Sequence, residues 1–596
     1  MQSQALLQER RRKLRRNGTA KTGEIEEREE ESGHKSACRK KEAAHKDELQ
    51  PFIHKGHMPT LITTATLRAM RALIVSVLLP CLSCVPSAGM TPEPSLDVDL
   101  AMPQGKPSAE QWLTDSLGYE IFVRSFADSG SDGSGDLTGI RQRLPYLQSL
   151  GVNLLWLTPI HPSPSYHGYD VTDYDAVHPD FGSLGDLDRL LAEAHQRGMR
   201  VILDLVVNHT AKTHPWFVAA KDAPTGSLAS QRYLFRGNDP GWQWLGNKVF
   251  RPLDGQPGRF YYGLFSSFMP DLNLRDVATA QAMEDIADRW LARGIDGFRL
   301  DAARYLTEWP DPTTATSQPS YSDTAETHQY WQRLRHSLSE KHPQSVLIGE
   351  VWSDVDSIAS YHSGGKELHA AFHFPLAGAM IDSIKRGTAK PLRDMLEVMA
   401  RGTVPARFFS PFLTNHDQRR LATELGGDLA MLRSAATLLL GMPGTPFLYY
   451  GEEVGLAQSS TSGDRGQRAP MPWDVVQKQS EQTDSLLAHY RRLGQLRKTE
   501  PGLRSTTLQM IWPAVPDDRV LAIYRSDSQS NGGVILVWNL GTTAAAGIRI
   551  SLPSDFPQGT PRELLGSVPM PSVTAMNRTA YVLPTIPPRG ALWIAP

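Results

Sequence analysis

Cysteine is nearly absent from this 596-residue chain: its three cysteines, Cys38, Cys81 and Cys84, all lie near the amino terminus. The rest of the sequence therefore has no disulfide framework, no cysteine-ligated metal site and no cysteine nucleophile. Net charge is almost absent as well, because 62 Lys and Arg residues nearly balance 64 Asp and Glu residues. Such a chain lacks the strongly basic footprint that phosphate backbones require, so we expect no nucleic-acid partner.

Long apolar runs are also missing. The run at residues 72–82 is interrupted by Pro80 and is shorter than the ~20 residues needed to cross a bilayer, so we expect no transmembrane helix. Its length and the small residues after it are typical of a signal-peptide core. Residues 70–88 are therefore predicted to be a signal peptide or lipoprotein leader, which implies a secreted or cell-envelope protein. Lipidation of Cys84, giving a lipid anchor, and ordinary cleavage a few residues later are alternatives.

The segment before this leader differs in composition from the rest of the chain. Residues 1–69 contain 15 Lys and Arg and 10 Asp and Glu with few large apolar side chains, which predicts a disordered charged extension. A basic arm for nucleic acid is the alternative, but acids are interspersed throughout it. We expect the true start at Met70, and peptides from residues 1–69 in the native protein would contradict this. Residues 89–110 are predicted to be a linker.

Short apolar runs that alternate with helical patterns follow the linker, which is typical of parallel strands joined by crossover helices. The helical patterns include Leu184–Arg197 and Val277–Arg293, which end at Gly198 and Gly294. The eight runs are 119–126, 153–159, 201–207, 297–302, 345–351, 370–375, 412–417 and 446–453.

Eight such units predict an α/β fold of the (β/α)₈ TIM-barrel type over residues 111–210 and 269–497. A doubly wound open sheet is the rival, but no Gly-x-Gly-x-x-Gly turn follows the first run. Residues 211–268, between the third strand and the helix before the fourth, are predicted to form a small inserted domain B. Alternating runs in residues 498–596 predict a C-terminal antiparallel β-sandwich.

Four of the predicted strands end in a carboxylate amid apolar neighbours: Asp204, Asp301, Glu350 and Asp417. Catalytic residues of such barrels come from the carboxyl ends of several strands. Any one of these acids could be a core charge satisfied by an arginine. Four of them at one barrel mouth would repel one another, which indicates a functional role.

Paired carboxylates suit glycoside hydrolysis, which needs one acid to protonate the leaving oxygen and one carboxylate to attack the sugar. Metal-assisted hydrolysis is the alternative, with Asp204, His209, His416 and Asp417 as ligands. Surrounding aromatic residues favour a substrate with rings that stack; they are Trp156, Tyr166, Tyr169, Phe268 and Trp352.

The motifs at these positions resemble glycoside hydrolase family 13, the α-amylase family, in a form intermediate between its oligo-1,6-glucosidase and neopullulanase groups. The resemblance covers about residues 115–590 and depends on several separated motifs in the right order. They are GVNLLWLTP (151–159), DLVVNHT (204–210), MPDLN (269–273), GFRLDAARYL (297–306), GEVW (349–352), FLTNHD (412–417) and GTPFLYYGEE (444–453).

The resemblance implies a retaining mechanism. Asp301 would be the nucleophile, Glu350 the general acid and base, and Asp417 the third acid, which binds sugar hydroxyls. The two reacting carboxyl groups would lie about 5–5.5 Å apart. Arg299, on the same strand face as Asp301, would keep that nucleophile ionised. The resemblance also implies that His209 and His416 bind the sugar and that Tyr169 provides the stacking platform.

Three positions bear on substrate specificity. The family's oligosaccharide-acting members resemble this chain in having Asp at Asp170, whereas starch-cleaving endo-enzymes often have a bulky aromatic there. Ala302 differs from the Val that follows the nucleophile in 1,6-specific relatives. The family's Lys-His pair is replaced by Arg304 and Tyr305, which leaves the leaving-group subsites undefined.

A glycine-rich loop at residues 128–136 predicts a Ca²⁺ site. Its spaced oxygen ligands, Asp128, Asp132, Ser134 and Asp136, suit a hard cation and resemble the calcium loop of oligo-1,6-glucosidase relatives. Gly130 replaces an Asn ligand of those relatives, and a plain flexible turn is the alternative. Asn208 matches a calcium-binding residue of many α-amylases.

Taken together, the residues and the resemblance predict a monomeric α-amylase that cleaves α-1,4-glucosidic bonds in starch-like glucans and maltooligosaccharides. An α-glucosidase or a glucan transglycosylase of the same family is the alternative within the enzyme class. A non-catalytic binding protein is a remote alternative, because the heavy chains of amino-acid transporters also resemble this family. The intact Asp301, Glu350 and Asp417 argue against it.

Overall fold

The computed structural model describes residues 107–596 apart from 461–462, 528–531, 557–560, 567–573 and 577–579. The predicted extension and leader, with Cys84, lie outside the described residues. The segment predicted as a linker ends earlier than residue 110, because Ser108 caps a helix that begins at Ala109. In the described part of the chain, no helix is both long enough and apolar enough to cross a bilayer.

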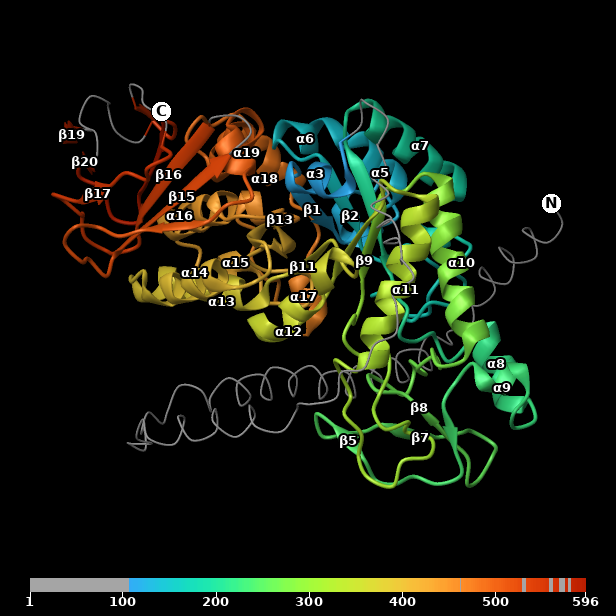
Figure 1. The fold of residues 1–596 in the computed structure, drawn as a ribbon. Helices are drawn as coiled ribbons and strands as arrows, with labels where there is room; N and C mark the ends of the chain where they lie inside the picture. The colour runs from blue at the N-terminus through green and yellow to red at the C-terminus, as the bar shows by residue number, and fades with distance from the viewer. Residues whose placement is uncertain (1–106, 461–462, 528–531, 557–560, 567–573, 577–579) are drawn as a thin grey trace, which may run out of the picture. The chain divides into compact units, whose positions relative to one another are not determined.

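A parallel sheet forms the centre of the catalytic region (Figure 1). It has eight strands, in the order β12-β11-β10-β9-β3-β2-β1-β13. Nearly all of its residues are buried on both faces, as expected for strands between a packed interior and an outer layer of helices. The strands are β1 (Gly118–Ile121), β2 (Leu154–Leu157), β3 (Arg200–Leu205), β9 (Gly297–Leu300), β10 (Val346–Gly349), β11 (Ala370–Phe372), β12 (Phe409–Ser410) and β13 (Phe447–Tyr449).

The two outer strands of this order meet at a seam that closes the barrel. Phe447 N, in β13, donates to Pro411 O at 2.9 Å, one residue beyond the end of β12. Gly444 lies at the same seam with φ +89°, and a Cβ built there would lie 1.9 Å from Phe409 O. Only glycine fits that backbone conformation and that close approach. The predicted (β/α)₈ barrel is therefore confirmed, and the open doubly wound sheet is excluded.

The strands are shorter than the predicted runs, and four of the runs differ in kind as well. The seventh strand was expected at residues 412–417, but it consists of Phe409–Ser410 and is followed by irregular backbone. Pro411 ends it, because proline has no N–H to donate to the ladder. The first, sixth and eighth runs divide into a short strand and a following helix: α4 (Val123–Phe126) after β1, α13 (Phe374–Arg386) after β11, and the 3₁₀-helix η4 (Glu452–Val454) after β13.

Helices surround the sheet, and their ends follow the sequence signals. Ser183 and Asp186 form a capping box at the start of α7, and Gly294 ends α10 in the left-handed conformation. The helices are α3 (Ala109–Thr114), α5 (Leu137–Gln142), α6 (Leu144–Ser149), α7 (Leu184–Gln196), α10 (Val277–Arg293), α11 (Ala325–Lys341), α12 (Val355–Ser360), α13 (Phe374–Arg386), α14 (Lys390–Arg401), α15 (Leu421–Glu424), α16 (Leu429–Gly441), α17 (Asp464–Gln467), α18 (Trp473–Ser480) and α19 (Leu486–Thr499).

The region between β3 and α10 contains short antiparallel strands, consistent with the predicted inserted domain at 211–268. Its own apolar cluster includes Trp242 and Phe250 together with Ala315 and Tyr321 from the loop after β9. The insert therefore shares its core with a barrel loop. Its elements are α8 (Pro215–Asp222), α9 (Leu228–Gln231), β4 (Phe235–Arg236), β5 (Gln243–Trp244), β6 (Asn247–Lys248), β7 (Phe250–Pro252) and β8 (Phe260–Tyr262).

The C-terminal region is an antiparallel sandwich, as predicted. A five-stranded sheet, β14-β15-β16-β21-β18, shares an apolar cluster with a three-stranded sheet, β17-β20-β19. Alternate residues of β15 divide between two cores: Val520 packs toward the second sheet, whereas Leu521 belongs to the barrel's core. The strands are β14 (Gln509–Ile511), β15 (Val520–Asp527), β16 (Gly532–Asn539), β17 (Arg549–Ser551), β18 (Arg562–Glu563), β19 (Thr574–Met576), β20 (Ala580–Val582) and β21 (Ala591–Ala595).

Candidate active site

The carboxyl ends of β3, β9 and β10 bring three of the predicted acids around one arginine. Arg299 of β9 is paired in register with Asp204 of β3 on one side and with Ile348 of β10 on the other. Asp301 and Glu350 follow directly after β9 and β10. The sheet register therefore places Arg299 between the two neighbouring strands that carry Asp204 and Glu350.

The Arg299 guanidinium contacts all three acids. Its Nη1 lies 2.5 Å from Asp204 Oδ1 and 2.7 Å from Asp301 Oδ1, and its Nη2 lies 2.9 Å from Glu350 Oε2. The arginine is buried, and it also lies over the Trp156 ring at 5.1 Å. One cation thus holds three carboxylates that would otherwise repel one another in a site of low dielectric constant.

The four strand-end acids differ in solvent access. The Asp204 side chain is 0% exposed, those of Asp301 and Glu350 are each 13% exposed, and that of Asp417 is 37% exposed. Asp204 also accepts a hydrogen bond from Trp156 Nε1 at 2.8 Å, and burial raises its pKa to about 6 against the opposing charge of Arg299. Asp204 is therefore a core charge satisfied by its neighbours, whereas the other three acids can reach a substrate.

Asp301 and Glu350 experience different electrostatic surroundings. Burial raises the pKa of both carboxyls, and the Arg299 charge opposes this shift in both. Glu350 faces the negative charges of Asp301 and Asp417, which raise its pKa further. Asp301 accepts a hydrogen bond from Arg299, which lowers its pKa, while the negative charge of Asp417 raises it and His416 lowers it. Both carboxyls therefore have a raised pKa and contact the same guanidinium; a retaining mechanism would need the proton on Glu350 and the charge on Asp301.

Tyr169 and His416 lie side by side next to these acids. Their rings stack at 5.5 Å with an angle of 10°, and Tyr169 OH lies 2.7 Å from His416 Nε2. His416 Nε2 also lies 3.3 Å from Asp417 Oδ2. The prediction that Tyr169, His416 and Asp417 belong to one site agrees with this geometry.

Asp170 and His209 are both buried. Asp170 is buried and accepts hydrogen bonds from Ser163 Oγ at 2.6 Å and from Ser165 Oγ, which fixes the loop that carries Tyr169. His209 is buried next to Asn208 and packs its ring 5.6 Å from Phe265. Their predicted roles in binding sugar stay predictions.

The predicted calcium loop uses its side chains to hold its own backbone. Asp128 accepts hydrogen bonds from the N–H groups of residues 130, 131 and 133, which lower its pKa. Asp132 accepts from Ser134 N, and Asp136 caps α5. Among the described residues, no three or more His, Cys, Asp or Glu side chains converge as a metal-binding group. The structure thus does not bring the four predicted ligands together, and calcium binding in this loop stays a prediction.

A second location, near Asn208, also has buried side-chain oxygens. Asn208 Oδ1, Asp271 Oδ2 and Glu308 Oε2 are buried oxygens without a hydrogen-bond partner. Burial and the neighbouring charge of Glu308 raise the pKa of Asp271 well above its usual range. Oxygen ligands of this type are what Ca²⁺ prefers, so Asn208 and Asp271 are the residues that would hold it.

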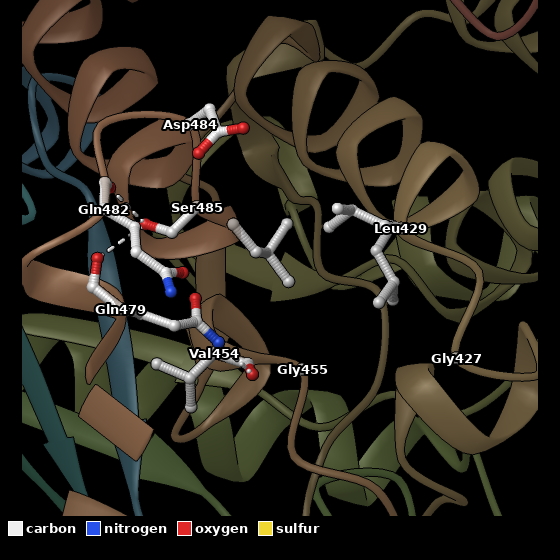
Figure 2. A pocket seen from close by; sticks show the side chains of 10 residues that line it. Gly427, Leu429, Val454, Gly455, Gln479, Gln482, Asp484 and Ser485 are labelled. Carbon is white, nitrogen blue, oxygen red and sulfur yellow. Dashed lines mark hydrogen bonds between the residues drawn. The ribbon is translucent and has the colours of Figure 1, made fainter. Parts of the chain in front are cut away.

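A hollow elsewhere on the barrel does not share any residue with this site. It lies between α16, η4 and the α18–α19 connection, and Figure 2 shows Gln482 and Ser485 on one side and Leu429 on the other. Ser485 Oγ donates to the Gln479 carbonyl at 2.7 Å, and Gln479 Nε2 donates to Val454 O at 2.9 Å. These polar groups form hydrogen bonds with neighbouring groups, so we do not consider this hollow a candidate catalytic site.

Two residues at the site were not anticipated. Arg468, which caps α17, contacts Asp417 Oδ1 at 2.9 Å, and its Nε donates to His416 O at 2.9 Å. Glu120 of β1 lies 2.5 Å from His416 Nδ1. Glu120 is the second residue of the run predicted at 119–126 and lies inside β1, so the rule that identified acids at strand ends does not find it. Arg468 follows a loop without any strand or helix pattern, and no sequence signal identifies it.

Comparison with known proteins agrees with this geometry. The sequence family described as "Alpha amylase, catalytic domain" matches residues 120–506. The chain belongs to the α-amylase family. As an α-amylase-family protein with this barrel and these acids, it is a glycoside hydrolase or transglycosylase, and the resemblance noted in the sequence is confirmed.

Two curated relatives and one solved structure illustrate the range of this α-amylase family. Alpha-amylase 3 of Dictyoglomus thermophilum is 37% identical over 388 residues, 65% of this chain and 72% of that protein. Trehalose synthase/amylase TreS of Mycobacterium tuberculosis is 31% identical over 567 residues, 82% of this chain and 90% of that protein. The crystal structure of the α-amylase from H. orenii superposes with a TM-score of 0.69 at 33% identity, and covers 80% of this chain and 99% of its own.

Proposed function

We propose that the protein is a retaining α-amylase that hydrolyses internal α-1,4-glucosidic bonds of starch-like glucans and maltooligosaccharides. The observation that carries this proposal is the pair Asp301 and Glu350, held by one buried guanidinium at 2.7 and 2.9 Å. Asp301 is the nucleophile, Glu350 the acid and base, and Asp417 the third acid that binds sugar hydroxyls.

The reaction has two displacements. Glu350 gives its proton to the glycosidic oxygen while the Asp301 carboxylate attacks the anomeric carbon, so the leaving chain departs with that proton and a glycosyl ester forms. Glu350, now a carboxylate, takes a proton from water, and the resulting oxygen displaces Asp301 from the same carbon. Because each displacement inverts the anomeric carbon, the product keeps the α-configuration.

The choice between hydrolysis and transfer depends on what attacks the glycosyl ester. Hydrolysis of α-1,4 bonds is supported by the two α-amylases among the relatives and by Ala302, which differs from the Val of 1,6-specific relatives. The trehalose synthase relative matches more of this chain than Alpha-amylase 3 does, which favours a glucan or maltose transglycosylase as the second candidate.

A time-resolved product profile distinguishes these functions. The purified protein is incubated separately with maltoheptaose, soluble starch and maltose, and products are separated by chromatography. The proposal expects short maltooligosaccharides from the first two substrates and an early loss of starch viscosity. Glucose as the sole early product would instead indicate an α-glucosidase. Longer chains or trehalose from maltose would indicate a transferase, and no product from any substrate would contradict catalysis.

We also propose that the protein binds Ca²⁺, with two locations to be tested. Adding Ca²⁺ after chelation is expected to raise the unfolding temperature by about 5 °C, because saturation near 100-fold above Kd contributes about 2.7 kcal/mol. The measurement is calorimetry of the wild type, with Mg²⁺ as the control cation. Loss of the rise in Asp132→Asn would support the loop, and loss in Asp271→Asn would support the Asn208 location. An unchanged wild type would contradict the proposal.

A further inference from the structure

Glu120 is a buried acid that the mechanism above does not use. It lies on β1, is 2% exposed, and points its carboxylate at one residue: Oε1 accepts from His416 N at 3.3 Å and lies 2.5 Å from His416 Nδ1. Because a backbone N–H already donates to this oxygen and a carboxylate only accepts, Nδ1 must carry a proton.

The other nitrogen of His416 also faces an acceptor. Nε2 lies 3.3 Å from Asp417 Oδ2 and 2.7 Å from Tyr169 OH. The tyrosine hydroxyl lies 3.3 Å from Asp204 Oδ2, a carboxylate to which it can donate only its own proton. Tyr169 then accepts from Nε2, so both ring nitrogens carry a proton when all these contacts are made.

We propose that Glu120 is a positioning residue that holds His416 as a doubly protonated imidazolium, with Nε2–H directed at Tyr169 and Asp417 and available to a sugar hydroxyl. In this arrangement His416 is the third cation of the site after Arg299 and Arg468, and it offsets the acids around it.

The electrostatics of the site agree with this arrangement. Burial opposes the charged form of His416, but the carboxylates of Asp417 and Glu120 outweigh it and raise the pKa of the ring. The Arg468 charge opposes them. The titratable and charged groups that face His416 are Glu120 on β1, Tyr169 after β2, Asp204 on β3, Asp301 after β9, Asp417 beside it and Arg468 at the end of α17.

The inference rests on the proposed function for its kinetic test, which is the pH profile of kcat/KM for maltoheptaose in Glu120→Gln. Glutamine keeps an oxygen that accepts from Nδ1–H but removes the charge, so the ring keeps its orientation and loses a proton more easily. The alkaline limb of the profile is expected to move down by about 1–2 pH units. KM at high pH should rise while kcat/KM at the acidic end stays near that of the wild type.

Glu452→Gln is the matched control, because Glu452 is also a buried glutamate near the barrel mouth but accepts from Tyr490 OH at 2.9 Å instead of from His416. Its profile should keep the wild-type limbs. A uniform loss of activity in Glu120→Gln at all pH values, with an unmoved alkaline limb, would overturn the proposal. If the wild type itself failed to hydrolyse maltoheptaose, the proposed function would fail instead.

Nitrogen NMR of the wild type with labelled histidine measures the protonation state of His416 directly. This test needs neither an activity assay nor a folded variant at position 120. His416→Gln identifies the His416 signals among those of the chain's 18 histidines. Signals of a doubly protonated ring through pH 7 would support the proposal. A neutral His416 ring at pH 7 would overturn it, whatever the kinetic profiles show.

Discussion

Asp301→Ala is expected to lower kcat for maltoheptaose hydrolysis on the order of 10⁴-fold or more, because removal of a nucleophile that works as a unit with its partners eliminates the covalent route. The folded state should persist, since burial disfavours the Asp301 charge and Arg299 keeps its contacts with Asp204 and Glu350. Initial rates and thermal unfolding on the same preparation measure both effects.

Glu350→Ala separates the two catalytic roles. A substrate such as α-maltosyl fluoride does not need a proton on its leaving group, so Glu350→Ala should recover formation of the glycosyl ester and Asp301→Ala should not. Asp188→Ala is the control. Asp188, on α7, is half-exposed and pairs with Arg293 of α10, so this substitution should leave the rates unchanged. Wild-type turnover of the fluoride by Asp301→Ala would show that the nucleophile is another residue.

Arg299→Met is expected to lower the free energy of unfolding by about 3–5 kcal/mol, the usual cost of leaving buried charges without their partner. Its three carboxylates would have higher pKa values in the folded state than in the unfolded chain. When the pKa of a carboxyl is higher in the folded state than in the unfolded chain, the free energy of unfolding falls as pH rises from the unfolded pKa to the folded pKa. The deficit should therefore be smallest near pH 4 and grow through pH 6, where Asp204 titrates in the wild type.

Urea unfolding at pH 4.5 and pH 7 measures this difference. Arg333→Met is the matched control: Arg333 is 49% exposed, and its Nε lies 2.6 Å from Glu284. Loss of such a pair should cost less than about 1 kcal/mol at either pH. An equal deficit for Arg299→Met at both pH values would show that packing, and not the carboxylates, accounts for its cost.

The barrel could be predicted from its sequence because strand and helix periodicities alternate and the helix ends have their own signals. The strand bounds were less accurate where a run of apolar residues changes structure within itself. Residues 119–126 look like one strand, but the chain turns after Ile121 into α4. Where β12 ends depends on Pro411 and on the close approach of Gly444 to Phe409, and the latter is a contact between distant segments.

The four strand-end acids of the site were predictable for the same local reason: each ends an apolar run, whereas Glu120 lies inside one. Their division into roles was not, because it depends on which neighbour each one meets across the sheet. Asp204 and Asp301 look alike in sequence, yet Asp204 is fully covered by Trp156 and Arg299. Arg468 reaches the site only through the folded path of the loop after β13.

The five-stranded C-terminal sheet has both faces covered, one by the second sheet and one by the barrel's core. Trp538 of β16 packs against the last turn of α16, where a Cβ added to Gly441 would lie 2.7 Å from its ring. The buried Arg525 guanidinium donates to Met442 O at 3.0 Å and to Leu503 O at 2.8 Å. The family match ends at residue 506, inside this contact. The end of the catalytic-domain match thus falls inside one compact unit, and the C-terminal sheet forms an outer wall of the catalytic domain that packs directly on α16.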